Sequence, residues 1–192
     1  MSTSKDIPIK AFTTPQKWRE WLEKSHAASD GLWLRIFKKD SGKKSVTHQQ
    51  ALDEALCFGW IDGQRNSHDE VSFLQKFTPR RSRSIWSKRN RDNVERLIKE
   101  KKMTPAGLAE IDRAKKDGRW ENAYDSPKNM EVPIDFLKEL KKDKKAYEFF
   151  QSLNKTNKFA IAFRLHTAKR PETRERRMKA FLTMLAKGEK LD

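Results

Sequence analysis

The sequence has few of the residues that build disulfide or metal sites. It contains one cysteine, Cys57, so a disulfide framework within the chain is excluded. The four histidines are scattered, without HxxxH or Cys/His spacing, and we predict no metal site. No cofactor-binding fingerprint occurs, so we predict no cofactor.

Long apolar runs are also missing. No stretch of about 18 apolar residues is present, so no membrane-spanning helix is expected. Residues 1–10 lack the apolar core of a secretory signal peptide. We therefore expect a cytoplasmic protein.

Recognisable catalytic groupings are absent as well. Ser84 and Ser87 have no histidine nearby in the sequence and lie outside a GxSxG turn. Asp53 and Glu54 are adjacent on a predicted helix, so their carboxylates diverge and do not share a proton. Cys57 is predicted to be a small core residue. We therefore predict no catalytic residue and expect a protein that is not an enzyme.

What the chain does have is aromatic residues. Apolar residues make up only 35% of the sequence, but six tryptophans and eleven phenylalanines supply large buried areas. Apolar periodicity and Thr-Pro starts predict helices beginning near Thr14 and Thr104. Strands are predicted over 32–37, 60–65 and 71–77, the last two as a hairpin around a polar turn.

These elements predict an α+β fold, with a small, mostly antiparallel sheet packed with helices and a C-terminal bundle of short helices. The predicted boundaries are an α+β domain over residues 1–120, a linker over 121–134 that contains two prolines, and a helical region over 135–192.

The densest local signal is the stretch Thr47–Gly63. Thr47 and Gln50 fit a capping box, and Gly59 stands where the following helix must end. Trp60 and Asp62 then share one face of a predicted strand. Asp62 is either a strand-end carboxylate bound by backbone N–H groups or one charged wall of a pocket.

Several motifs follow one another in a family-specific order. They are ALCFGWIDG at 55–63, FTPR at 77–80, SIWS at 84–87 with Asn90, DGRW at 117–120, and Thr173-Arg174 with Arg177. In these motifs the chain resembles the YdeI/OmpD-associated family, described as bacteriocin-protection proteins, from about Trp18 to Gly188. The resemblance implies a small bacterial protein tied by its family name to protection against antimicrobial peptides, and it implies no established catalytic mechanism.

The positive charge is concentrated in two segments. Residues 76–102 carry 11 basic and 3 acidic side chains, and residues 155–192 carry 11 basic and 4 acidic ones. Together they hold 15 of the 16 net positive charges. Such clustering is typical of proteins that bind polyanions, and it also occurs on surfaces that only keep a protein soluble.

Two binding hypotheses follow. The first is a pocket for an unknown small ligand or peptide, formed by Trp60, Asp62, Arg80, Ser84, Trp86, Ser87 and Asn90. Ser84 is predicted to cap a helix over 85–101, and Asn90 lies on the apolar stripe of that helix, where its amide needs a partner such as Asp62, nearby backbone or a ligand. The second hypothesis is binding of nucleic acid or another polyanion by Arg81, Arg83, Lys88, Arg89, Arg174 and Arg177.

Overall fold

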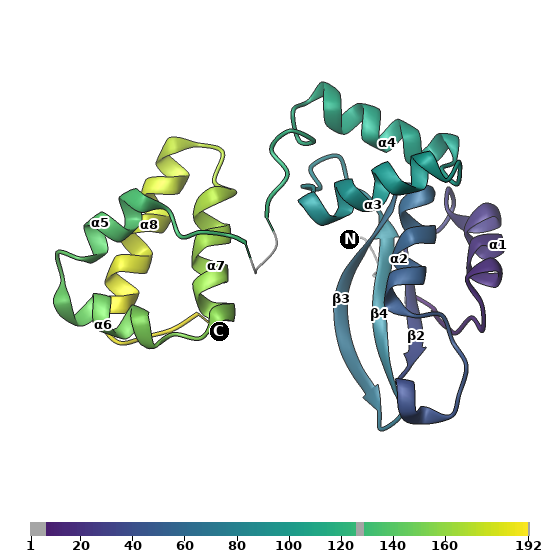
Figure 1. Ribbon diagram of the computed structural model, residues 1–192, viewed down its shortest axis with the longest axis horizontal. Coiled ribbons are helices and arrows are strands. Elements are labelled where there is room, and N and C mark those ends of the chain that lie inside the picture. Colours follow the sequence, from purple (N-terminus) through teal and green to yellow (C-terminus); the bar gives the residue numbers. More distant parts are fainter. Residues whose placement is uncertain (1–6, 126–128, 192) are drawn as a thin grey trace, which may run out of the picture. The chain divides into compact units, whose positions relative to one another are not determined.

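The computed structural model describes residues 7–125 and 129–191 (Figure 1). It divides into two compact units. The N-terminal unit is the chain up to Trp86 together with Asn90–Asn122. The C-terminal unit is Ser87–Arg89 together with the chain from Ala123 onward. The domain boundaries drawn from the sequence stay predictions. Residues 126–128 of the predicted linker and residues 1–6 lie outside the described residues.

A four-stranded sheet organises the N-terminal unit. Its strands are β1 (Ile9–Lys10), β2 (Leu32–Phe37), β3 (Trp60–Asp69) and β4 (Ser72–Pro79), in the spatial order β1-β2-β4-β3. Strand β4 pairs antiparallel with both β2 and β3, whereas β1 runs parallel to β2. The predicted α+β fold with a mostly antiparallel sheet is confirmed.

Strand β3 is longer than its sequence indicates. The polar stretch after residue 65 was predicted to be a turn, but Asn66, Ser67 and Asp69 pair with β4, and the turn is confined to Glu70 and Val71. The prediction was wrong because β3 is an edge strand whose side chains from Gly63 onward are exposed. An exposed edge strand needs no alternation of apolar residues.

Threonine caps define three helices of this unit. Thr14, Thr47 and Thr104 accept hydrogen bonds from the first turns of α1 (Pro15–Ser25), α2 (His48–Cys57) and α4 (Pro105–Lys116), respectively. The capping box of α2 is complete, because the Gln50 side chain also accepts from the Thr47 backbone N–H at 2.9 Å. Gly59 has a φ of +73°, the left-handed conformation expected just after a helix.

Helix α3 (Lys88–Lys99) begins three residues later than predicted. Ser84 does not cap it. The Ser84 hydroxyl instead accepts from the Arg81 backbone N–H at 3.0 Å, and the Ser84 N–H donates to the Arg81 carbonyl at 2.9 Å. A serine makes the same kind of hydrogen bond in a tight turn as at a helix cap, which explains why the sequence pattern misled.

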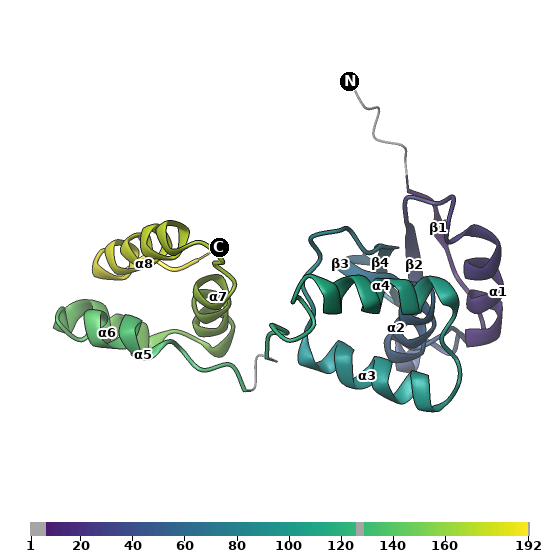
Figure 2. The same cartoon turned by 90° about the horizontal axis from the view of Figure 1, so that it is seen from above.

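Helices α1 and α2 cover one face of the sheet. The Trp18 indole N–H donates to the Ala51 carbonyl at 3.0 Å, and the Trp18 ring lies 5.8 Å from that of Phe77. Figure 2 shows α2 and α3 on the same side of the strands. Helix α4 approaches α2 closely, since a Cβ atom added at Gly107 would lie 2.3 Å from the Cys57 carbonyl oxygen.

Four short helices form the C-terminal unit. They are α5 (Ile134–Leu140), α6 (Lys144–Ser152), α7 (Lys155–His166) and α8 (Pro171–Ala186). Their shared core contains Phe136, Leu140, Phe150, Ile161, Leu165, Phe181 and Leu185. The predicted C-terminal helices are confirmed. Asn154 caps α7, and Asp135 lies in the first turn of α5. Within the described residues, every helix falls short of the length and apolar content needed to cross a bilayer.

Candidate functional site

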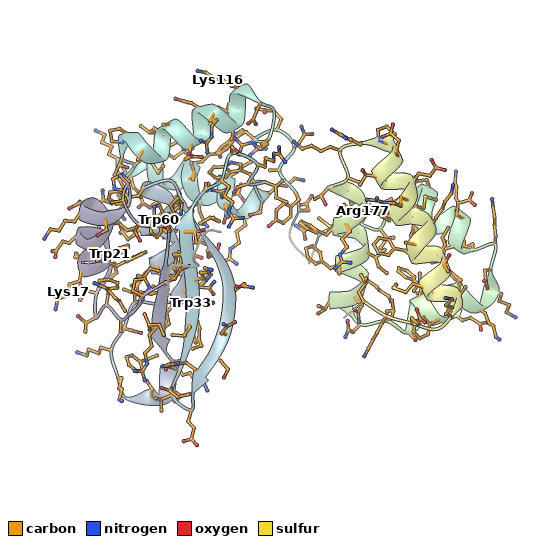
Figure 3. All side chains as sticks on the ribbon, turned by 180° about the vertical axis from the view of Figure 1, so that it is seen from behind. Lys17, Trp21, Trp33, Trp60, Lys116 and Arg177 are labelled. Carbon is orange, nitrogen blue, oxygen red and sulfur yellow. The ribbon has the colours of Figure 1, made fainter. Side chains whose placement is uncertain are left out.

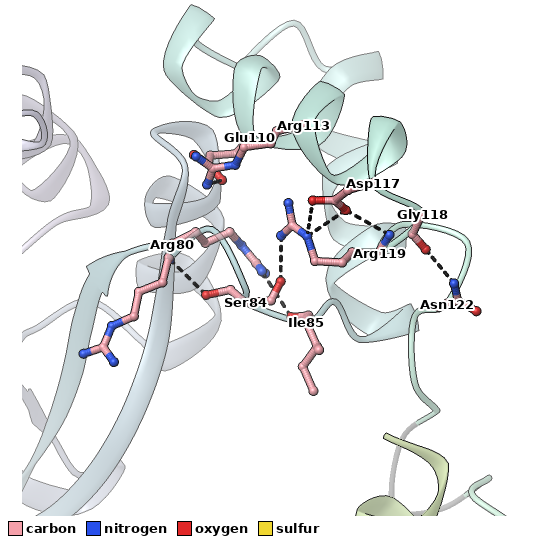
Figure 4. A network of polar contacts seen from close by, with 10 residues as sticks. Arg80, Ser84, Ile85, Glu110, Arg113, Asp117, Gly118, Arg119 and Asn122 are labelled. Carbon is pink, nitrogen blue, oxygen red and sulfur yellow. Dashed lines mark hydrogen bonds and ion pairs between the residues drawn. The ribbon is translucent and has the colours of Figure 1, made fainter. Parts of the chain in front are cut away.

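Two buried arginines hold one short loop of the N-terminal unit. Arg80, at the end of β4, is 6% exposed, and Arg119, just after α4, is 4% exposed. Arg119 Nη1 donates to the Ser84 carbonyl at 2.8 Å, and Arg80 Nη1 donates to the Ile85 carbonyl at 3.3 Å (Figure 4). The two guanidinium groups therefore fix consecutive carbonyls of the chain between β4 and α3.

Two tryptophans complete this arrangement. The guanidinium carbon of Arg80 lies 3.6 Å from the centroid of the Trp86 ring, close enough for a cation–π contact. The Trp86 ring meets the Trp120 ring edge-on, with centroids 4.9 Å apart. We call Arg80, Trp86, Arg119 and Trp120 the arginine–tryptophan layer. Because both indoles are buried, this layer is part of the core of the unit.

Some hydrogen-bond donors of the layer have partners within the described residues and others have none. Arg119 Nε donates to both carboxylate oxygens of Asp117, at 2.7 and 2.8 Å. Arg119 Nη2 and Trp86 Nε1 are buried and have no hydrogen-bond partner in the part of the chain that is described. An unsatisfied buried donor destabilises a fold by about 1–3 kcal/mol. These unsatisfied donors therefore lower the stability of the layer that holds the loop.

The loop that the layer holds is strongly basic and faces solvent. We define the basic loop as residues 81–85. Arg81 and Arg83 are exposed, and among the described residues neither takes part in an ion pair. The two hydrogen bonds between Ser84 and Arg81 close a turn inside the loop. The fold therefore presents two guanidinium groups on a short, braced segment.

The tryptophan and aspartate of the ALCFGWIDG motif lie in a different environment. Trp60 is 1% exposed, its indole N–H donates to the His26 carbonyl at 3.2 Å, and its ring packs against Trp18 and Trp21. The Asp62 carboxylate meets His48 Nε2 at 3.0 Å. The carboxylate thus has a side-chain partner from α2 that the sequence did not suggest.

A backbone hydrogen bond connects the corner that carries Trp60 and Asp62 to Arg80. The Arg80 N–H donates to the Gly59 carbonyl at 3.0 Å, so the corner after α2 lies beside the start of the loop. The side chains of Trp60 and Trp86, however, pack in separate aromatic clusters. The ligand-binding roles of these residues stay predictions.

Ser87 and Asn90, two of the seven predicted pocket residues, follow Trp86 in the sequence. Ser87 forms an isolated bridge with Tyr124, and both belong to the C-terminal unit. Asn90 is half-buried near the start of α3. Their ligand-binding roles also stay predictions.

Some of the predicted polyanion-binding residues have partners within the chain. Lys88 Nζ pairs with Asp125 at 2.5 Å, whereas Arg89 is exposed. Arg174 makes two parallel hydrogen bonds to Asp135, at 2.6 and 2.8 Å, and chiefly through them it lowers the pKa of the Asp135 carboxyl.

Arg177 donates to the Arg164 carbonyl of the same unit. Three of the predicted cations, Lys88, Arg174 and Arg177, therefore also stabilise the C-terminal unit. Their polyanion-binding roles, with those of Arg81, Arg83 and Arg89, stay predictions.

Arg119 and Trp120 are structural partners of Arg80 and Trp86 that the sequence did not assign to a site. The signal that was available is the DGRW motif, in which an arginine stands next to a tryptophan directly after a helix-ending glycine. The charged residue of that motif, Arg119, is buried in the fold, and a buried charge needs hydrogen-bond partners.

Two family models match the chain. The model described as "Domain of unknown function (DUF8412)" matches residues 10–110, and the model described as "Bacteriocin-protection, YdeI or OmpD-Associated" matches residues 129–188. The resemblance inferred from the motifs is confirmed in the second range, which contains Thr173, Arg174 and Arg177. The ALCFGWIDG, FTPR and SIWS motifs lie in the first range. Comparisons with curated proteins and with solved structures gave no match.

The first match covers more than half of the 192 residues, whereas the second covers the helices α5 to α8. The chain therefore belongs to the family described as a domain of unknown function (DUF8412), and its C-terminal region carries the match to the YdeI/OmpD-associated, bacteriocin-protection proteins.

Proposed function

We propose that this chain is a non-enzymatic, cytoplasmic binding protein whose N-terminal unit binds the phosphate backbone of nucleic acids through the basic loop. The observation that carries the proposal is the contrast between Arg80 and Arg119, which are buried and hold the loop, and Arg81 and Arg83, which are exposed on it. The guanidinium fork matches a phosphate group, and a braced loop loses little conformational freedom on binding.

The charge distribution supports the same partner. The segment 76–102, which includes the basic loop, carries a net charge of +8. A cluster of one sign attracts polyanions over distances comparable to the Debye length. A small-ligand pocket has less support, because Trp60 and Trp86 expose only 1% and 2% of their surfaces.

The bacteriocin-protection match favours a second role, in protection against bacteriocins or cationic antimicrobial peptides. A net charge of +16 opposes the direct capture of a cationic peptide, because like charges repel across an interface. We therefore place any protective action downstream of an anionic partner, and not in a complex with the peptide itself.

The test is binding of a short fluorescent oligonucleotide, followed by anisotropy across a salt series. The double variant Arg81→Ala/Arg83→Ala should bind more weakly and flatten the slope of log K against log salt by roughly 1.4–1.8, the value for two lost phosphate contacts. The matched control is Lys17→Ala/Lys24→Ala, which removes the same charge from exposed positions of α1.

Equal losses in the two double variants would mean that only net charge matters, and would overturn the basic loop as the site. Failure of the wild-type chain to bind at low salt would overturn the proposed function itself. Anionic vesicles serve as a second control, since tighter binding to vesicles than to the oligonucleotide would point to a lipid surface.

A further inference from the structure

The face of the sheet opposite α1 and α2 carries aromatic and basic side chains. In β2, the buried residues Leu32, Leu34 and Ile36 alternate with Trp33, Arg35 and Phe37, which are half-buried. Successive side chains of a strand point to opposite faces, so the second set lies on the face that α1 and α2 leave open. Figure 3 shows Trp33 on this strand.

The strand register adds β4 residues to the same face. Trp33 is paired with Lys76, and Arg35 is paired with Leu74. The Lys76 ammonium lies 5.5 Å from the Trp33 ring centroid, the Arg35 guanidinium carbon lies 4.8 Å from that of Phe37, and the Lys43 ammonium lies 5.5 Å from the same Phe37 ring. We call Trp33, Arg35, Phe37, Lys43 and Lys76 the aromatic face.

The charges of this face are arranged in two ways. Arg35 is fixed, because it donates to Asp69 at 2.5 Å and to the Ser72 hydroxyl at 2.9 Å. Lys43 and Lys76 take part in no ion pair among the described residues. The face therefore offers two ammonium groups outside any ion pair of the described residues, each lying over an aromatic ring.

The spacing of the rings suits an extended ligand. Trp33 and Phe37 are four residues apart on one strand, which separates them by about 13 Å. Trp33 and Phe37 are partly exposed, and a pair of aromatic side chains on an open sheet face is a surface on which flat, apolar groups can stack. Every nucleic-acid base has such a flat face, and the adjacent ammonium groups suit the phosphates between bases.

We infer that the aromatic face is a stacking platform for single-stranded nucleic acid. The inference rests on the proposed function and deepens it by assigning the strand preference. Bases stack on Trp33 and Phe37, while Lys43 and Lys76 contact the phosphates. A duplex hides the faces of its bases, so it binds through its backbone alone and more weakly at this face.

The test compares matched single-stranded and duplex oligonucleotides. Trp33→Leu keeps apolar bulk at the position but removes the ring, and it should lower single-strand affinity about tenfold while duplex affinity stays unchanged. Trp33→Phe restores a ring and should bind single strands close to the wild-type level. Trp21→Leu, on the covered side of the sheet, is the control for the loss of a half-buried tryptophan.

The outcomes separate the two proposals. Equal affinity of the wild-type chain for single strands and duplex, with Trp33→Leu behaving like the wild type, would overturn the stacking platform and leave backbone binding in place. Loss of single-strand binding in both Trp33→Leu and Trp33→Phe would also overturn it, because a ring would then not be the recognised feature. No binding of either oligonucleotide at low salt would overturn the proposed function.

Discussion

The N-terminal unit places a cation over an aromatic ring in two contrasting environments. In the arginine–tryptophan layer, the Arg80 guanidinium lies 3.6 Å from the Trp86 ring centroid, and both residues are almost fully buried. On the aromatic face, the Lys76 ammonium lies 5.5 Å from the Trp33 ring, and both are half-buried. A cation over a tryptophan ring therefore braces a buried loop in one place and lies on a partly exposed sheet face in the other. Burial distinguishes the two roles.

The largest expected effect is a difference in the free energy of unfolding between substitutions of Trp86 and Trp33. Trp86→Ala removes a buried ring and leaves a cavity beside Trp120, so the free energy of unfolding should fall by about 3–5 kcal/mol. Trp33→Ala removes a half-buried ring from an open face and should lower it by about 1 kcal/mol. Chemical denaturation of both variants measures the difference. Similar losses would mean that Trp33 is as much a core residue as Trp86.

A smaller difference in stability is expected between substitutions of Arg119 and Arg35. Arg119→Lys cannot reproduce the hydrogen bonds to both Asp117 and the Ser84 carbonyl, and it should destabilise the fold by about 1–3 kcal/mol. Arg35→Lys alters a pair whose side chains are 30% and 37% exposed, and it should change stability by about 0.5 kcal/mol. If Arg35→Lys proved the more damaging change, the aromatic face would be part of the structural core.

The smallest effect concerns pH. The Ser72 hydroxyl, assisted by Arg35, lowers the pKa of the Asp69 carboxyl from 3.8 to about 2. A lowered carboxyl pKa stabilises the folded state above about pH 4, and this contribution is lost as the pH falls through 2. An NMR titration of Asp69 should therefore give a midpoint near 2 in the wild-type chain. Ser72→Ala should move this midpoint toward 3.8. A wild-type midpoint near 4 would mean that Ser72 and Arg35 do not hold the Asp69 carboxylate in solution.

Local signals in the sequence predicted much of the fold. Thr14, Thr47 and Thr104 each cap a helix because a threonine followed by a proline or by a capping-box glutamine acts within one turn. Strand β2 was predicted because its six residues are almost continuously apolar. The polar end of β3 was missed, since pairing at an exposed edge leaves no mark in apolar periodicity.

The candidate site was harder to predict because its contacts are distant in the sequence. Asp62 pairs with His48, 14 residues earlier, and Arg119 binds the carbonyl of Ser84, 35 residues earlier. No motif spacing encodes such pairs. The sequence likewise grouped Trp60 with Trp86, although the fold packs the two indoles in separate clusters. Tertiary structure alone decides which aromatic residues are buried and which face solvent.

The most direct test of the account is the affinity of the wild-type chain for a short single-stranded oligonucleotide, measured by anisotropy at several salt concentrations. We expect binding that is tight at low salt, with log K falling linearly as log salt rises. Absence of binding at the lowest salt concentration would contradict it, and would reduce the basic loop and the aromatic face to features of a solvated surface.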